Sequence, residues 1–194
     1  VRSENWNVLD IAKIRRASRL NKPRKLSTKF HQKMRSYTLD QVDTLSYDDA
    51  LHVLQAWRVD RNDSLFVKVY EHFLNNGDKL FAGDAKKLVD FLYCMTTCRP
   101  KNLGKRFHLE KRSPVNDFEA ILDKNLPLIM KNIDDLSVES LANLLTSLYL
   151  SRTDRFQTLV SKLDYLIGEK AENLDANSLS LVVRAFTHMF NNKM

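Results

Sequence analysis

Apolar residues recur along the chain at steps of three and four residues, the spacing that places side chains on one face of an α-helix. The pattern is clearest in four segments, each of which opens on a leucine and continues as an apolar stripe. The opening residues are Leu45, Leu80, Leu136 and Leu174. In three of the four, a Ser or Asp follows the leucine directly, and these residue types cap helices. Each segment therefore predicts the start of a helix.

Further amphipathic stretches lie between these openings and predict a second helix for each unit, over residues 64–74, 115–130 and 156–167. The opening leucines are separated by 35, 56 and 38 residues, which indicates one period with an insertion in the middle. A single hairpin cannot bury both of its apolar faces, so neighbouring hairpins must stack. The sequence thus predicts an all-α fold, a right-handed α-solenoid of antiparallel helical hairpins with repeats of about 37 residues.

The organisation along the chain follows from the same pattern. Residues 1–44 are predicted to form a basic arm and a degenerate leading hairpin, with helices over residues 5–20 and 28–43. Residues 45–194 are predicted to form the helical-repeat domain, with a basic insertion at residues 99–114. No second helix follows the last opening helix, so we expect an apolar face at that end that needs a cap, a partner subunit or further sequence.

Composition supports the helical interpretation. Four glycines and four prolines are too few for the many tight turns of a sandwich or barrel. No run of about 18 apolar residues occurs, so a transmembrane segment is not expected.

The four repeated segments resemble the organellar helical-repeat families, namely the heptatricopeptide and octotricopeptide repeats and the related FAST-kinase-like proteins. The resemblance covers residues 45–194 and is closest over residues 136–189. It implies a mitochondrial or plastid location, and either RNA binding or a structural place in an organellar assembly such as a mitochondrial ribosome. It does not imply an enzyme. Armadillo, tetratricopeptide and pentatricopeptide units have hairpins of similar period.

The net charge of +7 is concentrated in two elements. Residues 1–40 hold 11 Lys or Arg against 3 acids, and residues 99–112 hold 6 against 1. The remaining residues hold 14 against 20, so the repeat body is acidic. Dense cations suit a phosphate backbone, and the neighbouring Phe30 and Tyr37 can stack on unpaired bases.

These two elements are therefore predicted to bind RNA, ribosomal RNA in particular. The candidate residues are Arg15, Arg16, Arg19, Arg24, Lys25, Lys29, Lys33 and Arg35 in the arm, and Arg99, Lys101, Lys105, Arg106, Lys111 and Arg112 in the insertion. Three alternatives remain open for this charge. It can pair with acidic protein neighbours, contact anionic lipid, or be residual targeting character.

Candidate chemistry is sparse. Cys94 and Cys98 lie four residues apart, which suits packed thiols, part of a metal site or a redox pair. The five histidines are scattered and are expected at the surface or an interface. No metal-ligand spacing or glycine-rich phosphate loop occurs, so no metal, cofactor, catalytic residue or small-molecule substrate is expected. The aromatic residues Trp57, Phe91 and Phe186 are predicted to be core.

Together these features favour a non-catalytic, RNA-associated subunit of a ribonucleoprotein in the mitochondrial matrix, such as a mitochondrial ribosomal protein, in contact with other protein subunits. The alternative is a lineage-specific scaffold subunit of a large mitochondrial complex, such as an ATP synthase, with protein contacts only.

Overall fold

The structure is a computed structural model that describes residues 7–20, 28–57, 64–97, 114–151, 153 and 155–191. All regular structure in these residues is helical, which confirms the predicted all-α class. The helices of the first half are α1 (Val8–Leu20), α2 (Thr28–Asp40), α3 (Tyr47–Trp57) and α4 (Ser64–Phe81). Those of the second half are α5 (Ala85–Thr97), α7 (Pro114–Asn132), α8 (Val138–Ser151), α9 (Gln157–Lys170) and α10 (Ala176–Asn191).

The predicted second helices of the hairpins are α4, α7 and α9, and α4 is longer than its apolar pattern indicated. It continues from residue 74 to Phe81 through Asn76, whose φ of −118° and ψ of 15° are not helical. The Asn76 side chain donates from Nδ2 to the carbonyl oxygen of His72 at 3.1 Å. This bond satisfies a backbone acceptor close to the irregularity, and the chain resumes helical geometry after it.

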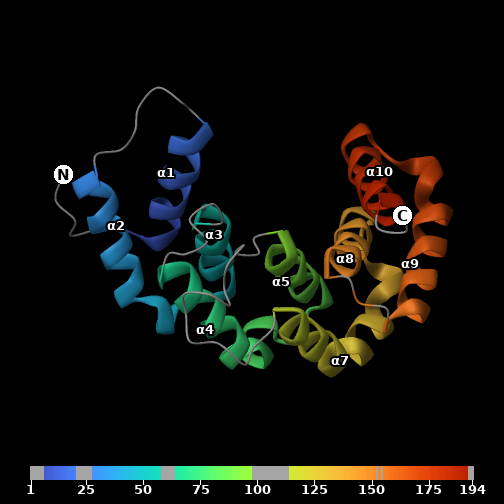
Figure 1. Ribbon diagram of the computed structural model, residues 1–194, viewed down its shortest axis with the longest axis horizontal. Coiled ribbons are helices and arrows are strands. Elements are labelled where there is room, and N and C mark those ends of the chain that lie inside the picture. Colours follow the sequence, from blue (N-terminus) through green and yellow to red (C-terminus); the bar gives the residue numbers. More distant parts are fainter. Residues whose placement is uncertain are drawn as a thin grey trace. The chain divides into compact units, whose positions relative to one another are not determined.

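The chain divides into two compact units, and the division falls at Ala82–Gly83. In the first unit α1 packs against α3, and α4 packs against both α3 and α2 (Figure 1). The sequence predicted a boundary after residue 44, between a leading arm and the repeats. That boundary stays a prediction; within this unit α1 packs against α3 and buries Ile11 and Ala12.

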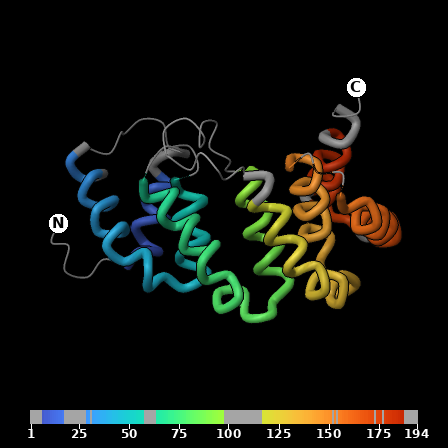
Figure 2. The backbone as a smooth tube through the Cα atoms, turned by 60° about the horizontal axis from the view of Figure 1, so that its bottom comes forward, coloured from blue at the N-terminus to red at the C-terminus, as the bar shows by residue number. Residues whose placement is uncertain are grey.

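In the second unit α8 lies between α5 and α10 (Figure 1), and the same order is visible from a second direction (Figure 2). Helix α9 packs against α8, and α7 packs against α5. With neighbours on several sides, α8 buries every residue from Ser140 to Leu148. Helix α8 is thus buried around most of its circumference, and its buried side chains include the polar Ser140, Asn143, Thr146 and Ser147.

Three helix starts share one turn geometry, which is built on the predicted leucines. A short 3₁₀ turn precedes each leucine: η1 (Val42–Thr44), η2 (Ile133–Asp135) and η3 (Ala171–Asn173). The leucine itself is extended, with ψ of 136° at Leu45, 141° at Leu136 and 129° at Leu174. Its N–H donates to the carbonyl oxygen at the start of the 3₁₀ turn in all three cases. The leucine thus ends one helical segment and sets the direction of the next.

A polar side chain caps each of these helices, as predicted. Ser46 Oγ accepts from the N–H of Asp49 at 3.3 Å, and Ser137 Oγ accepts from the N–H of Ser140 at 3.2 Å. Asp175 Oδ1 accepts from the N–H of Ser178 at 2.7 Å. These acceptors satisfy backbone donors that have no partner within the helix.

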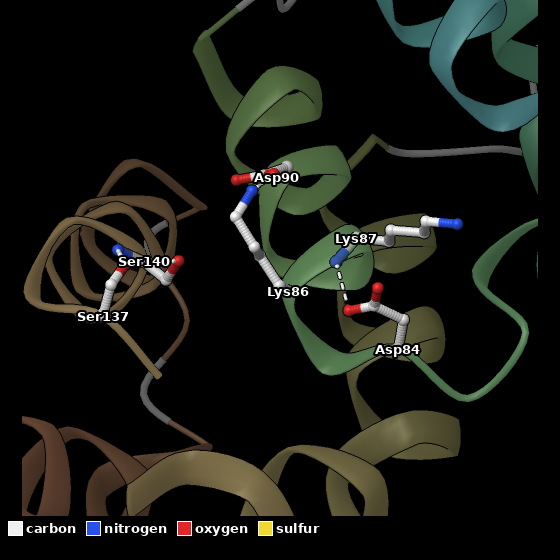
Figure 3. A network of polar contacts seen from close by, with 6 residues as sticks. All are labelled: Asp84, Lys86, Lys87, Asp90, Ser137 and Ser140. Atoms are coloured by element: carbon white, nitrogen blue, oxygen red, sulfur yellow. Dashed lines mark hydrogen bonds and ion pairs between the residues drawn. The ribbon is translucent and has the colours of Figure 1, made fainter. Parts of the chain in front are cut away.

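The prediction for Leu80 is wrong, because this leucine lies in the last turn of α4. The turn into α5 is formed by Ala82 and Gly83, with φ of 48° and 75°. Asp84 then caps α5 by accepting from the N–H of Lys87 at 3.1 Å (Figure 3). Gly83 therefore takes the place that a leucine holds at the other three helix starts.

The four capping residues are Ser46, Asp84, Ser137 and Asp175, at separations of 38, 53 and 38 residues.

Candidate nucleic-acid interface

Five of the predicted RNA-binding side chains are described, and all five belong to α1 and α2. They are Arg15, Arg16, Lys29, Lys33 and Arg35. The other nine lie outside the residues whose side chains the structure describes, namely Arg19, Arg24, Lys25, Arg99, Lys101, Lys105, Arg106, Lys111 and Arg112.

Exposed cations gather in pairs on these two helices. Arg16 and Lys13 are three residues apart on α1, and Lys29 and Lys33 are four residues apart on α2, so each pair shares a helix face. All four side chains are exposed. Lys13 was not among the predicted residues, although its spacing from Arg16 would have identified it. We call Lys13, Arg16, Lys29 and Lys33 the leading cations.

The leading cations have no ion pair within the described structure, whereas four basic residues further along the chain have one. Elsewhere, Lys68 lies 3.8 Å from Asp43, Lys86 lies 2.7 Å from Asp90, and Lys162 lies 2.8 Å from Asp134. The hydrogen bond from Lys86 to Asp90 raises the pKa of this lysine, against the opposing effect of partial burial. Asp43, Asp90 and Asp134 therefore each neutralise a lysine of their own unit.

A further pair of ion pairs joins α7 to the residues that precede α9. The Arg155 guanidinium lies 2.8 Å from Asp123 through Nη2 and 3.4 Å from Glu119 through Nη1. Because Asp123 and Glu119 are four residues apart on α7, one guanidinium reaches both carboxylates. This arginine is thus committed to contacts within the protein.

Arg15 does not present its charge at the surface. Its side chain is only 6% exposed, and its guanidinium lies over the Trp57 ring, 4.7 Å from the ring centroid. Trp57 is fully buried, as predicted for a core aromatic residue. A cation stacked on an indole inside the first unit supports packing between α1 and α3. We therefore leave Arg15 out of the proposed interface.

Arg35 also has a contact inside the protein. It is half-buried, and its Nη2 donates a hydrogen bond to Ser64 Oγ at the start of α4. The bond links α2 to α4, which pack against each other.

Two basic side chains bond to the turns that precede the hairpins. Nε2 of His72 on α4 lies 3.2 Å from the carbonyl oxygen of Leu45. Nζ of Lys170 on α9 lies 2.9 Å from the carbonyl oxygens of both Asp134 and Leu136. His72 is buried, whereas the histidines were expected at the surface or at an interface. A buried backbone carbonyl needs a donor, and the second helix of the hairpin supplies it.

Little else in the described residues offers chemistry. Cys94 is buried in the core, whereas Cys98 lies outside the described residues. The described part of the chain contains no group of His, Cys, Asp and Glu side chains that could hold a metal ion. Phe91 is buried as predicted, and Phe186 is half-buried. None of the described helices combines the length and apolar character that crossing a membrane requires.

Comparison with family models, curated proteins and solved structures finds no match for this chain.

Proposed function

We propose that this protein is a non-catalytic helical-repeat subunit that binds RNA through the leading cations and the basic insertion. The observation that carries the proposal is that Lys13 and Arg16 on α1, and Lys29 and Lys33 on α2, form exposed pairs on two helix faces and have no ion pair within the described structure. Four exposed cations without acidic partners are available to neutralise phosphates. Each phosphate contact releases counterions, which supplies most of the free energy of non-specific binding.

The proposed architecture is a right-handed α-solenoid with a repeat of about 38 residues. It is supported by the turn geometry that Leu45, Leu136 and Leu174 share, and by the equal intervals between the first and last pairs of capping residues. The middle interval is 15 residues longer and contains the predicted basic insertion. A mitochondrial matrix location and membership of a ribonucleoprotein rest on the resemblance to organellar repeat families.

The test is binding of the full chain to a fluorescein-labelled single-stranded RNA, measured by anisotropy between 50 and 300 mM KCl. We expect affinity to fall steeply as salt rises. A plot of the logarithm of the association constant against the logarithm of the salt concentration has a negative slope. If each leading cation contacts one phosphate, changing all four to glutamine should make this slope shallower by roughly 3 units.

The matched control removes the same total charge elsewhere, by changing Lys79, Lys131, Lys162 and Arg184 to glutamine. It should leave the slope close to that of the unmodified protein. An equal decrease of the slope in the two variants would mean that only net charge matters, and the proposed site would be wrong. Absence of RNA binding at 50 mM KCl would favour the alternative function, a scaffold subunit with protein contacts only.

The scaffold alternative, a subunit of a large mitochondrial complex with protein contacts only, is favoured by one observation on α10. Its exposed side chains include Leu179 and Val183, whereas the first helices of the other hairpins bury the corresponding residues.

A further inference from the structure

Helix α2 carries a polar stripe on the side opposite its buried face. The helix packs against α4, η1 and α1 (Figure 1), and it buries Met34 and Thr38. The exposed residues on the other side follow one another at steps of three and four, so they share one face. These residues are Lys29, Gln32, Lys33 and Ser36, and the exposed Asp40 ends the stripe. Two cations and two uncharged polar side chains are therefore presented together.

The two uncharged residues of the stripe are free to contact a ligand. The side chains of Gln32 and Ser36 are exposed, four residues apart, and make no hydrogen bond within the described structure. The hydroxyl on the buried face of the same helix behaves differently, because Thr38 Oγ1 donates to the carbonyl oxygen of Met34 at 2.9 Å. The donors and acceptors of Gln32 and Ser36 thus face solvent beside the two lysines.

The first unit offers no ring for stacking on unpaired bases among its described residues. Phe30 and Tyr37, which the sequence suggested for this role, are both half-buried and interact within the protein. Tyr70 is half-buried and stacked on Phe66, with ring centroids 6.5 Å apart and an interplanar angle of 12°. Recognition of single-stranded RNA relies largely on base stacking against aromatic side chains. The described part of this unit is therefore poorly suited to a single strand.

The chemistry of the stripe matches the surface of an RNA double helix. The minor groove of A-form RNA is wide and shallow, and it displays 2′-hydroxyls between the two phosphate backbones. Lysine side chains can pair with the phosphates, whereas a glutamine amide and a serine hydroxyl can each donate to and accept from a 2′-hydroxyl. Neither kind of contact requires an unpaired base.

We propose that α2 binds double-stranded RNA along the minor groove, with Lys29 and Lys33 on phosphates and Gln32 and Ser36 on 2′-hydroxyls. This inference rests on the proposed RNA-binding function, and it adds the class of RNA and two uncharged contact residues. A DNA duplex has no 2′-hydroxyl, so it is held by the cations alone and binds more weakly.

The test compares a short RNA duplex with a DNA duplex of the same sequence and with an unpaired RNA strand, each labelled with fluorescein and titrated with the full chain. We expect the RNA duplex to bind most tightly. Changing both Gln32 and Ser36 to alanine should raise its Kd roughly three- to tenfold, because two exposed hydrogen bonds are lost. The Kd for the DNA duplex should not change. The salt dependence of RNA binding should also stay the same, because uncharged side chains release no counterions.

A matched control changes Gln157 and Ser161 to alanine, since these two residues have the same types and spacing and are exposed on α9. This variant should leave all three Kd values unchanged. Alanine favours helix, so both variants should fold, which circular dichroism verifies.

Equal weakening by the two variants would overturn the assignment to α2. Equal affinity of the unmodified protein for the two duplexes, or tighter binding of the unpaired strand, would overturn the preference for double-stranded RNA. In each of these cases the proposed function stands if the leading cations still set the salt dependence. No binding to either RNA at low salt would refute both proposals.

Discussion

Lys170 at the end of α9 donates from Nζ to the carbonyl oxygen of Leu136 at 2.9 Å and so joins the last turn of one helix to the turn before its hairpin partner. The same ammonium bonds the carbonyl oxygen of Asp134, also at 2.9 Å. His72 makes the corresponding contact with Leu45 in the first unit. Two hairpins thus close in the same way with different basic residues.

Replacing Lys170 with Met should lower the free energy of unfolding by about 1–2 kcal/mol, because hydrogen bonds from a charged donor contribute more than neutral ones and this site is only partly buried. The measurement is urea denaturation followed by circular dichroism. Lys131→Met is the control, since Lys131 occupies the last turn of α7 and no hydrogen bond or ion pair from its side chain is described. A loss of similar size in both variants would show that only the interaction with the helix dipole matters.

The cap of α5 is the second point to test. Changing Asp84 to Ala removes the acceptor for the N–H of Lys87 and should cost about 1 kcal/mol of stability. Asp84→Asn retains a side-chain oxygen and should recover most of that loss. If alanine and asparagine were equally destabilising, the charge of Asp84 rather than its hydrogen bond would be responsible. Thermal denaturation of the three proteins decides between these outcomes.

Two adjacent arginines of α1 should behave differently. Arg15→Ala should destabilise the fold by about 1–2 kcal/mol, because it removes a buried side chain stacked on Trp57. Arg16→Ala should change stability by less than about 0.5 kcal/mol, as expected for an exposed residue. Urea denaturation measures both changes. Equal stability of the two variants would contradict the packing role of Arg15.

The bond between Lys86 and Asp90 predicts a pH dependence. The pKa of Lys86 is raised in the folded protein, above its ordinary value of 10.5. The folded state therefore holds this proton more tightly, and the stabilisation is present below pH 10.5 and lost as pH rises through the folded pKa. Because Lys86 is largely exposed and Asp90 is only half-buried, the contribution of the pair at neutral pH should be about 0.3–0.5 kcal/mol.

A double-mutant cycle with Lys86→Gln and Asp90→Asn measures this contribution. The coupling free energy, obtained from urea denaturation, should be constant between pH 7 and 9 and smaller at pH 11. A coupling that is unchanged at pH 11 would mean that the lysine proton is not involved.

The sequence by itself determined the helical class and the position of most helices. Apolar residues at steps of three and four predicted α7 and α9, and the order leucine, cap, apolar stripe located the starts of α3, α8 and α10. These signals are local, because a capping hydrogen bond spans three residues and an amphipathic stripe is a property of one helix.

The tertiary structure alone decided which similar side chains have the same role. Leu80 resembles the opening leucines but lies inside α4, because Gly83 takes the left-handed conformation that turns the chain into α5. Arg15 and Arg16 are identical in type and adjacent, yet only Arg15 is stacked on Trp57 and buried. Leu141 and Leu179 occupy equivalent places after their caps, and only Leu141 is covered. Burial depends on neighbours distant in sequence, and helical periodicity does not encode them.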